Sequence, residues 1–181
     1  MSNFTGFSGA VNLSTVSSRT EIAREGQLGA DNWGGSVQAA YGFELSSSSV
    51  IGFGLNYSLG KSKSGIGYDN KVDTDTLNIK NQYSFYLEPG SLLSDNTLLY
   101  GKISVEKGKF AVTSIPASNS FSKSISGTGY GVGLRHMLDK SKFVQVEFMK
   151  VGYKTITPPK DLTVKLESST TLGTIGIGMK F

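Results

Sequence analysis

The chain has 181 residues, enough for one domain with its own core and too few for two domains of ordinary size. Its 18 lysines and arginines against 14 aspartates and glutamates give a formal net charge of +4, too mild for a typical nucleic-acid-binding protein. The absence of cysteine excludes disulfides, thiolate metal sites and cysteine nucleophiles, and a single histidine leaves little room for a histidine metal site. No cofactor is therefore expected.

Alternation of large apolar residues with small or polar ones recurs along the chain and predicts β-strands, because successive strand side chains point to opposite faces. In Ile51–Leu59 every odd position is large and apolar. Eight such segments follow one another: Phe7–Thr15, Ser36–Leu45, Ile51–Leu59, Leu77–Leu87, Leu99–Glu106, Gly127–Leu138, Phe143–Thr155 and Thr174–Phe181. In the seventh, Val151 and Tyr153 fall out of phase with Val146 and Phe148, which predicts a β-bulge near Met149.

The connections between these segments alternate in length. The long ones are Ser17–Asn32, Gly60–Thr74, Ser114–Gly127 and Thr157–Thr171, and the shorter ones are Ser46–Ser49, Glu88–Asn96 and Asp139–Lys142. Long loops on one rim and short turns on the other are typical of bacterial outer-membrane barrels. We therefore predict an all-β fold, an eight-stranded antiparallel up-and-down transmembrane β-barrel formed by residues 1–181 as a single domain, with both termini on the short-turn rim.

The two faces of the strands decide between a soluble and a membrane barrel. A soluble barrel such as a lipocalin turns its apolar face inward, whereas a membrane barrel turns it outward into lipid. The small or polar face is rich in glycine, which weakens a solvent-exposed sheet but leaves room for long charged side chains inside a narrow barrel. Aromatic residues fall near both ends of the apolar face and predict two girdles at the membrane surfaces, Trp33, Tyr57, Tyr130 and Tyr153 toward the long loops and Phe43, Phe85 and Phe181 toward the short turns.

Charged residues on the inward face predict a closed lumen. Charges in a narrow interior must pair or stay hydrated, and eight strands enclose a space only just wide enough for their own side chains. The residues expected to form this network are Lys80, Lys102, Glu106, Arg135 and Glu147. A small porin-like channel for small or hydrophobic solutes is the alternative.

Several segments resemble a known family. Leu98–Lys102, Gly127–Arg135, the Asp139–Lys142 turn and Phe143–Glu147 are similar to the bacterial outer-membrane β-barrel domain family, which includes the OmpA transmembrane domain and the OmpX-type and opacity-type small barrels. The last strand, with alternating Ile175, Ile177, Met179 and Phe181, resembles the signal read by the outer-membrane assembly machinery. The resemblance implies a monomer in the bacterial outer membrane, in contact with its lipid and lipopolysaccharide. No leader is visible at Met1–Phe4, so we expect the signal peptide to have been removed.

The family includes adhesins, cell-wall tethers, small channels and lipid-modifying enzymes, so it does not define a function. No peptidoglycan-binding domain follows the eighth strand, which argues against a tether. The only histidine, His136, is expected on the outward face, and it lacks the His-x-Ser pair of the barrel deacylases. We therefore expect no enzymatic activity.

The long loops offer two further features. The acidic segment Tyr68–Asp75 lacks the glycine and the final glutamate of a calcium loop and is expected to be a solvated turn. The lysines Lys61, Lys63, Lys123 and Lys160 could meet lipopolysaccharide phosphates. Because loops on a rigid scaffold carry function, the sequence predicts a non-enzymatic surface protein with a structural or adhesive role.

Overall fold

The structure is a computed structural model that describes residues 3–22, 26–68, 74–113, 121–154 and 166–181. It contains nine strands in this order: β1 (Gly6–Ile22), β2 (Gly26–Ser46), β3 (Ser49–Leu59), β4 (Lys61–Tyr68), β5 (Thr74–Ser94), β6 (Thr97–Thr113), β7 (Phe121–Met137), β8 (Lys142–Tyr153) and β9 (Leu166–Lys180). The described residues include no helix long and apolar enough to cross a membrane.

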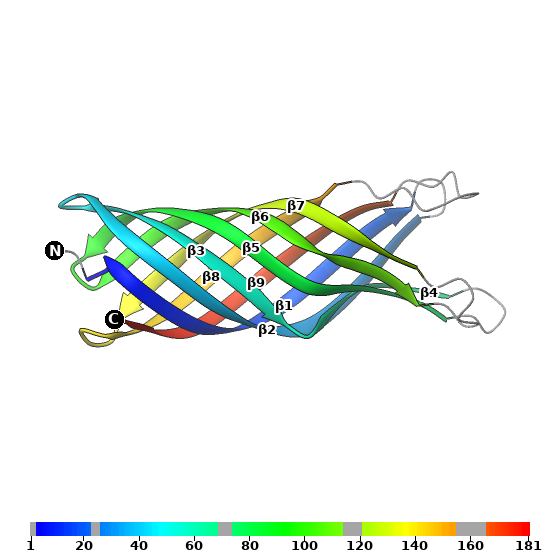
Figure 1. Cartoon of the computed structure of the whole chain (residues 1–181), viewed down its shortest axis with the longest axis horizontal. Coiled ribbons are helices and arrows are strands. Elements are labelled where there is room, and N and C mark those ends of the chain that lie inside the picture. Colours follow the sequence, from blue (N-terminus) through cyan, green and yellow to red (C-terminus); the bar gives the residue numbers. More distant parts are fainter. Residues whose placement is uncertain (1–2, 23–25, 69–73, 114–120, 155–165) are drawn as a thin grey trace.

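The strands close into a barrel. Each strand pairs antiparallel with its neighbours, β1 pairs with β9, and β3 pairs with β5 to complete the circle. β3 and β4 both pair with β5 and are separated only by Gly60, whose φ of 100° interrupts the strand. The two segments therefore form one strand of the barrel. The result is the predicted eight-stranded antiparallel barrel, and both chain ends lie at the same end of it (Figure 1).

The strands are longer than the alternation predicts. β1 and β2 pair as far as Ile22 and Gly26, and β4 lies within a segment expected to be a loop. Apolar alternation marks only the part of a strand that has lipid on one side, whereas backbone pairing continues where both faces are polar. The turn expected at Glu88–Asn96 is likewise shorter, because β5 runs on through Pro89 to Ser94.

The predicted bulge near Met149 is wrong. β8 keeps one continuous register with β7 and with β9 over its whole length. Val151 and Tyr153 are buried because they face the lumen, in phase with Phe143 and Gln145. Register shifts lie instead in β5, between Lys80 and Tyr83, where Asn81 has a φ of 51°, and between Leu92 and Ser94. Others lie in β4, between Lys63 and Gly65, and in β2, between Glu44 and Ser46.

The outer wall is apolar and the interior is polar, the reverse of a soluble protein. Large apolar side chains such as Leu13, Ile103 and Ile177 are more than half exposed, while Gln145, Glu147 and Lys102 are buried. Lipid in place of water outside accounts for this inversion. Six of the seven predicted girdle residues lie on the outer wall, Trp33, Tyr57, Tyr130, Phe43, Phe85 and Phe181. Tyr153 does not, because only 8% of it is exposed and it faces the lumen.

Aromatic rings inside the barrel lie over glycines of the neighbouring strand. Tyr86 of β5 is in direct register with Gly54 of β3, and Tyr100 of β6 is in direct register with Gly133 of β7. A Cβ atom added to either glycine would overlap the phenol ring beside it. The glycines therefore make room for neighbouring aromatic rings rather than, as expected, for charged side chains from opposing strands.

We predict that Gly133→Ala destabilises the barrel by about 1–3 kcal/mol, because the new methyl group must displace the buried Tyr100 ring. Urea unfolding in lipid vesicles measures the effect, and the fluorescence of Trp33, the only tryptophan, reports the loss of lipid contact. Gly101→Ala on β6 is the matched control, because a Cβ there meets only a carbonyl oxygen at 4.0 Å. Equal unfolding midpoints for both variants would contradict the ring–glycine packing.

The turn between β7 and β8 is stabilised by Asp139. Its carboxylate accepts backbone N–H groups of Ser141 and Lys142, both at 2.7 Å, and the Ser141 hydroxyl at 3.0 Å. The backbone N–H of Ser141, followed by that of Lys142, holds the pKa of this carboxyl below its usual value. A lowered pKa in the folded state means that the ionised form stabilises the turn, and that this stabilisation is lost as the pH falls through the folded-state pKa.

We therefore predict that Asp139→Ala lowers the stability of the barrel at neutral pH and that the difference from the wild type disappears below the pKa of Asp139. Unfolding midpoints measured across the acidic range test this, with Lys140→Ala in the same turn as the control. A difference that stays constant through the acidic range would show that the charge of Asp139 is not involved.

Candidate functional site

The lumen is the candidate site, and its floor is apolar. Phe4, Ala10, Val50, Leu98, Tyr100, Met137 and Phe143 form a buried cluster at the short-turn end, with Leu92 packed against it. The segment before β1 contributes to this cluster, because the Asn3 side chain donates to the Asp95 carbonyl and to Asn96 Oδ1, both at 3.0 Å. These hydrogen bonds hold Asn3 against the turn between β5 and β6, with Phe4 inside the barrel.

Two acidic and two basic side chains from four strands meet above this floor. Lys102 Nζ lies 3.0 Å from Glu88 Oε1 and 2.6 Å from Glu147 Oε2. Arg135 Nη2 lies 3.0 Å from Glu88 Oε2. All four side chains are buried, and their formal charges cancel. Such a set is stable inside a membrane only when every charge has a partner, which these contacts provide.

Aromatic and amide groups complete this layer. The Lys102 ammonium lies 4.3 Å from the centre of the Tyr86 ring, and the Arg135 guanidinium lies 4.9 Å from that of Tyr100. Gln145 accepts a hydrogen bond from Arg135 Nε at 3.0 Å and donates to Asn12 and Gln38 at 3.0 and 3.1 Å. The hydrogen bonds therefore reach from β7 and β8 across to β1 and β2, and the layer spans the lumen.

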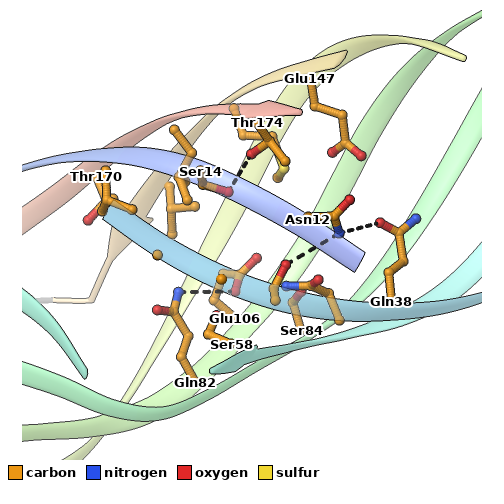
Figure 2. A pocket seen from close by; sticks show the side chains of 18 of the residues that line it. Asn12, Ser14, Gln38, Ser58, Gln82, Ser84, Glu106, Glu147, Thr170 and Thr174 are labelled. Carbon is orange, nitrogen blue, oxygen red and sulfur yellow. Dashed lines mark hydrogen bonds between the residues drawn. The ribbon is translucent and has the colours of Figure 1, made fainter. Parts of the chain in front are cut away.

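A cavity of about 90 Å³, lined by both polar and apolar side chains, lies above this layer (Figure 2). The lining of the cavity includes Lys102, Glu147 and Tyr86, so the charged layer closes its lower end. Its walls carry hydroxyl and amide groups, among them the Ser14–Thr174 pair at 2.8 Å. The cavity is large enough for a few water molecules and too small for a drug-sized ligand.

Glu106 is the acidic residue of the cavity wall. Its Oε1 accepts the Ser104 hydroxyl at 2.7 Å, and its Oε2 lies 3.5 Å from Gln82 Nε2. Gln82 also donates to the Tyr153 hydroxyl at 2.8 Å. Unlike Glu88 and Glu147, Glu106 forms no ion pair with a cation of the described residues within 4.0 Å.

The structure brings four of the five predicted lumen residues together inside the barrel, Lys102, Glu106, Arg135 and Glu147. Lys80 does not belong to this set. It is in register with the exposed Lys109, while the preceding Ile79 is in register with the buried Phe110, so Lys80 lies on the outer wall. The register shift around Asn81 exchanges the two faces of β5 at this point.

The sequence analysis missed Glu88, which pairs with both cations of the network. The run Glu88-Pro89-Gly90 carries turn residues and was assigned to a connection. Glu88 nevertheless has the same parity as Ser84 and Tyr86, and continuing the alternation through Pro89 would have placed it in the lumen. Gln145 could have been found in the same way, because it alternates with Phe143 and Glu147.

His136 lies on the outer wall, as expected, and its Nδ1 is 2.9 Å from the Thr97 hydroxyl. Among the described residues no three His, Cys, Asp or Glu side chains are arranged to hold a metal ion. Most of the acidic segment Tyr68–Asp75, as well as Lys160, lies outside the described residues.

A closed barrel with an apolar outer wall and a paired polar interior defines a membrane protein of the outer-membrane barrel class. The family model described as "Outer membrane protein beta-barrel domain" matches residues 2–181. The chain therefore belongs to the outer-membrane β-barrel domain family, and its location is the bacterial outer membrane. No curated protein sequence matches the chain.

Solved structures share the fold at low sequence identity. Ail, the attachment invasion locus protein of Yersinia pestis, in complex with the heparin analogue sucrose octasulfate, is 15% identical with a TM-score of 0.58, over 98% of this chain and 100% of that one. Neisserial surface protein A is 13% identical with a TM-score of 0.59, over 96% and 97%. The Escherichia coli outer membrane protease OmpT is 10% identical with a TM-score of 0.51, over 100% and 98%.

We predict that Glu88→Gln destabilises the barrel by about 3–5 kcal/mol, because it leaves a buried Arg135 charge without its partner. Glu106→Gln is the matched control, a buried carboxylate in the same lumen without a cation, and we expect a change of less than about 1 kcal/mol. Urea unfolding in lipid vesicles compares the two. A larger effect at Glu106 than at Glu88 would contradict the assigned network.

Proposed function

We propose that the protein is a non-enzymatic outer-membrane barrel with a closed lumen that acts from the cell surface, in a structural or adhesive role. The observation that carries the proposal is the sequence of layers inside the barrel. The cavity of about 90 Å³ ends on the layer of Glu88, Lys102, Arg135 and Glu147, and the apolar cluster lies below this layer. A solute would have to break these ion pairs and then cross the apolar floor.

The placement of the reactive residues supports a non-enzymatic role. A histidine that acts as a general acid or base must lie in a pocket that can hold substrate, whereas His136 faces outward beside Thr97. The carboxylates Glu88 and Glu147 are engaged with cations in the lumen. Two proteins with this fold, an attachment invasion locus protein and a neisserial surface protein, also favour a role at the cell surface.

The closed lumen is tested by recording from planar lipid bilayers that contain the purified full chain. We expect no reproducible unit conductance, because the charged layer and the apolar floor block the pore. A triple variant, Glu88→Ala, Tyr100→Ala and Arg135→Ala, removes side chains from both layers and should conduct if it folds. Stable steps of defined size in the wild-type protein would overturn the proposal and favour the small-channel alternative.

The surface role is tested separately on cells that display the wild-type barrel or a variant whose four long loops are shortened to turns. Binding to immobilised heparin and to fixed epithelial cells is compared. We expect the shortened form to bind less while it still assembles in the outer membrane. Equal binding by both forms would argue against a loop-borne adhesive function and leave the structural role.

A further inference from the structure

Four lysines gather on the outer wall of the barrel toward the long-loop end. Lys80 of β5 is directly opposite Lys109 of β6, and Lys107 lies two residues from Lys109 on the same face. Ser126 of β7 is in register with Lys107 and accepts the backbone N–H of Lys154 at 2.9 Å, so Lys154 lies two strands from Lys107. We call Lys80, Lys107, Lys109 and Lys154, together with Ser124 and Ser126 between them, the lysine patch.

The patch lies outside the lumen, because the residues adjacent to its lysines point inward. Ile79, Gly108, Phe110 and Tyr153 are buried, whereas Lys107, Lys109 and Lys154 are exposed and Lys80 is half-buried. At the strand spacing of about 4.8 Å and the residue rise of about 3.4 Å, the Cα atoms of the patch lie within roughly 15 Å of one another.

The lysines have no acidic side chain beside them among the described residues of this wall. Among the residues whose side chains the structure describes, the outward face of β5–β8 carries no aspartate or glutamate. Lys80 and Lys109 lie directly opposite each other on neighbouring strands. Like charges in this arrangement repel each other and destabilise a sheet. An anionic ligand on the wall would remove this repulsion.

The depth of the patch in the membrane indicates which anion that is. Along β6 the outward residues Thr97, Leu99, Gly101, Ile103 and Val105 precede Lys107. Ten residues of a strand tilted by about 40° span about 25 Å along the membrane normal, the height of the lipid-facing band of such barrels. Lys107 and Lys109 therefore lie where the lipid headgroups begin, at the surface opposite the short turns.

We propose that the lysine patch binds the phosphate groups of a phosphorylated glycolipid in the outer leaflet, of the lipid A type. Lysine ammonium groups pair with phosphate oxygens, and the exposed Ser124 and the half-buried Ser126 between the lysine rows place hydroxyl groups beside them. Two outward tyrosines, Tyr130 and Tyr83, border the patch toward the membrane centre, where they contact the upper acyl chains. Tyr83 is in register with Lys107. The lipid phosphate is favoured over a soluble anion because the side chains face sideways into the headgroup layer.

The proposal concerns the outer wall and does not depend on the closed lumen, so each can fail without the other. It also concerns lysines other than the loop residues considered in the sequence analysis.

The test is a titration of the detergent-solubilised full chain with diphosphoryl lipid A, followed by native mass spectrometry. The variant K80Q/K107Q/K109Q/K154Q removes the charges and keeps much of the side-chain length. A lysine at an anionic lipid surface contributes about fivefold in affinity, so we expect at least a tenfold weaker Kd. The corresponding Lys→Arg variant should retain binding, and binding by the wild type should weaken as salt is raised.

Lys140→Gln with Lys142→Gln, in the turn at the opposite end, is the matched control and should bind like the wild type. The wild type and the four-lysine variant should bind dephosphorylated lipid A with the same, weak affinity. Unchanged electrophoretic mobility of the unheated protein shows that each variant is folded, and K80Q/K109Q alone replaces the larger variant if that one does not fold.

Three results would overturn the proposal. The first is equal affinity of the wild type and the folded lysine variant for diphosphoryl lipid A, which would make the lysines ordinary interfacial anchors. The second is a failure of the wild type to distinguish phosphorylated from dephosphorylated lipid. The third is displacement of the lipid by inorganic phosphate at equal concentration, which would assign the patch to a soluble anion.

Discussion

The structure depends on the pairing of buried charges inside the barrel. In a bilayer every backbone N–H and C=O must be hydrogen-bonded within the protein, and a closed sheet achieves this without exposed edges. Closing eight strands leaves a narrow interior that the side chains fill. Lys102 and Arg135 can be buried there only because Glu88 and Glu147 lie within 3.0 Å of them. Backbone closure therefore makes charge pairing necessary once these charged side chains lie inside.

The packing around this layer follows from the same constraint. The rings of Tyr86 and Tyr100 flank Lys102 and Arg135, and each ring occupies the space left by a glycine on the next strand. The glycines therefore bring ring and cation into contact within a narrow lumen. Below them the apolar cluster, which includes Phe4, and the neighbouring Asn3 close the short-turn end. The interior is a stack of side chains whose upper cavity opens on no continuous path to the other side.

The outer wall of the barrel faces lipid rather than water. Its apolar side chains match the hydrocarbon core, and the lysines of the patch lie beyond the end of that band on β5, on β6 and directly after β8. A charge that must be paired inside the barrel can reach headgroups and water on the outside. The half of the wall with the lysine patch thus combines an apolar band with a cationic border, and the change occurs within two residues, between Val105 and Lys107.

The barrel, its strand number and the direction of its faces follow from the alternation of residues along the chain, because alternation is a local property that every strand repeats. It also predicted the burial of Lys102, Glu106, Arg135 and Glu147. The places where the inward and outward faces of a strand exchange, or where turn residues obscure the alternation, depend on contacts between strands. The register shift at Asn81 places Lys80 on the outer wall, and the unbroken register of β8 places Tyr153 in the lumen. β5 continues through Pro89, which places Glu88 within a strand. Which charges meet depends on the relative register of strands distant in the sequence, and backbone pairing around the whole barrel sets that register.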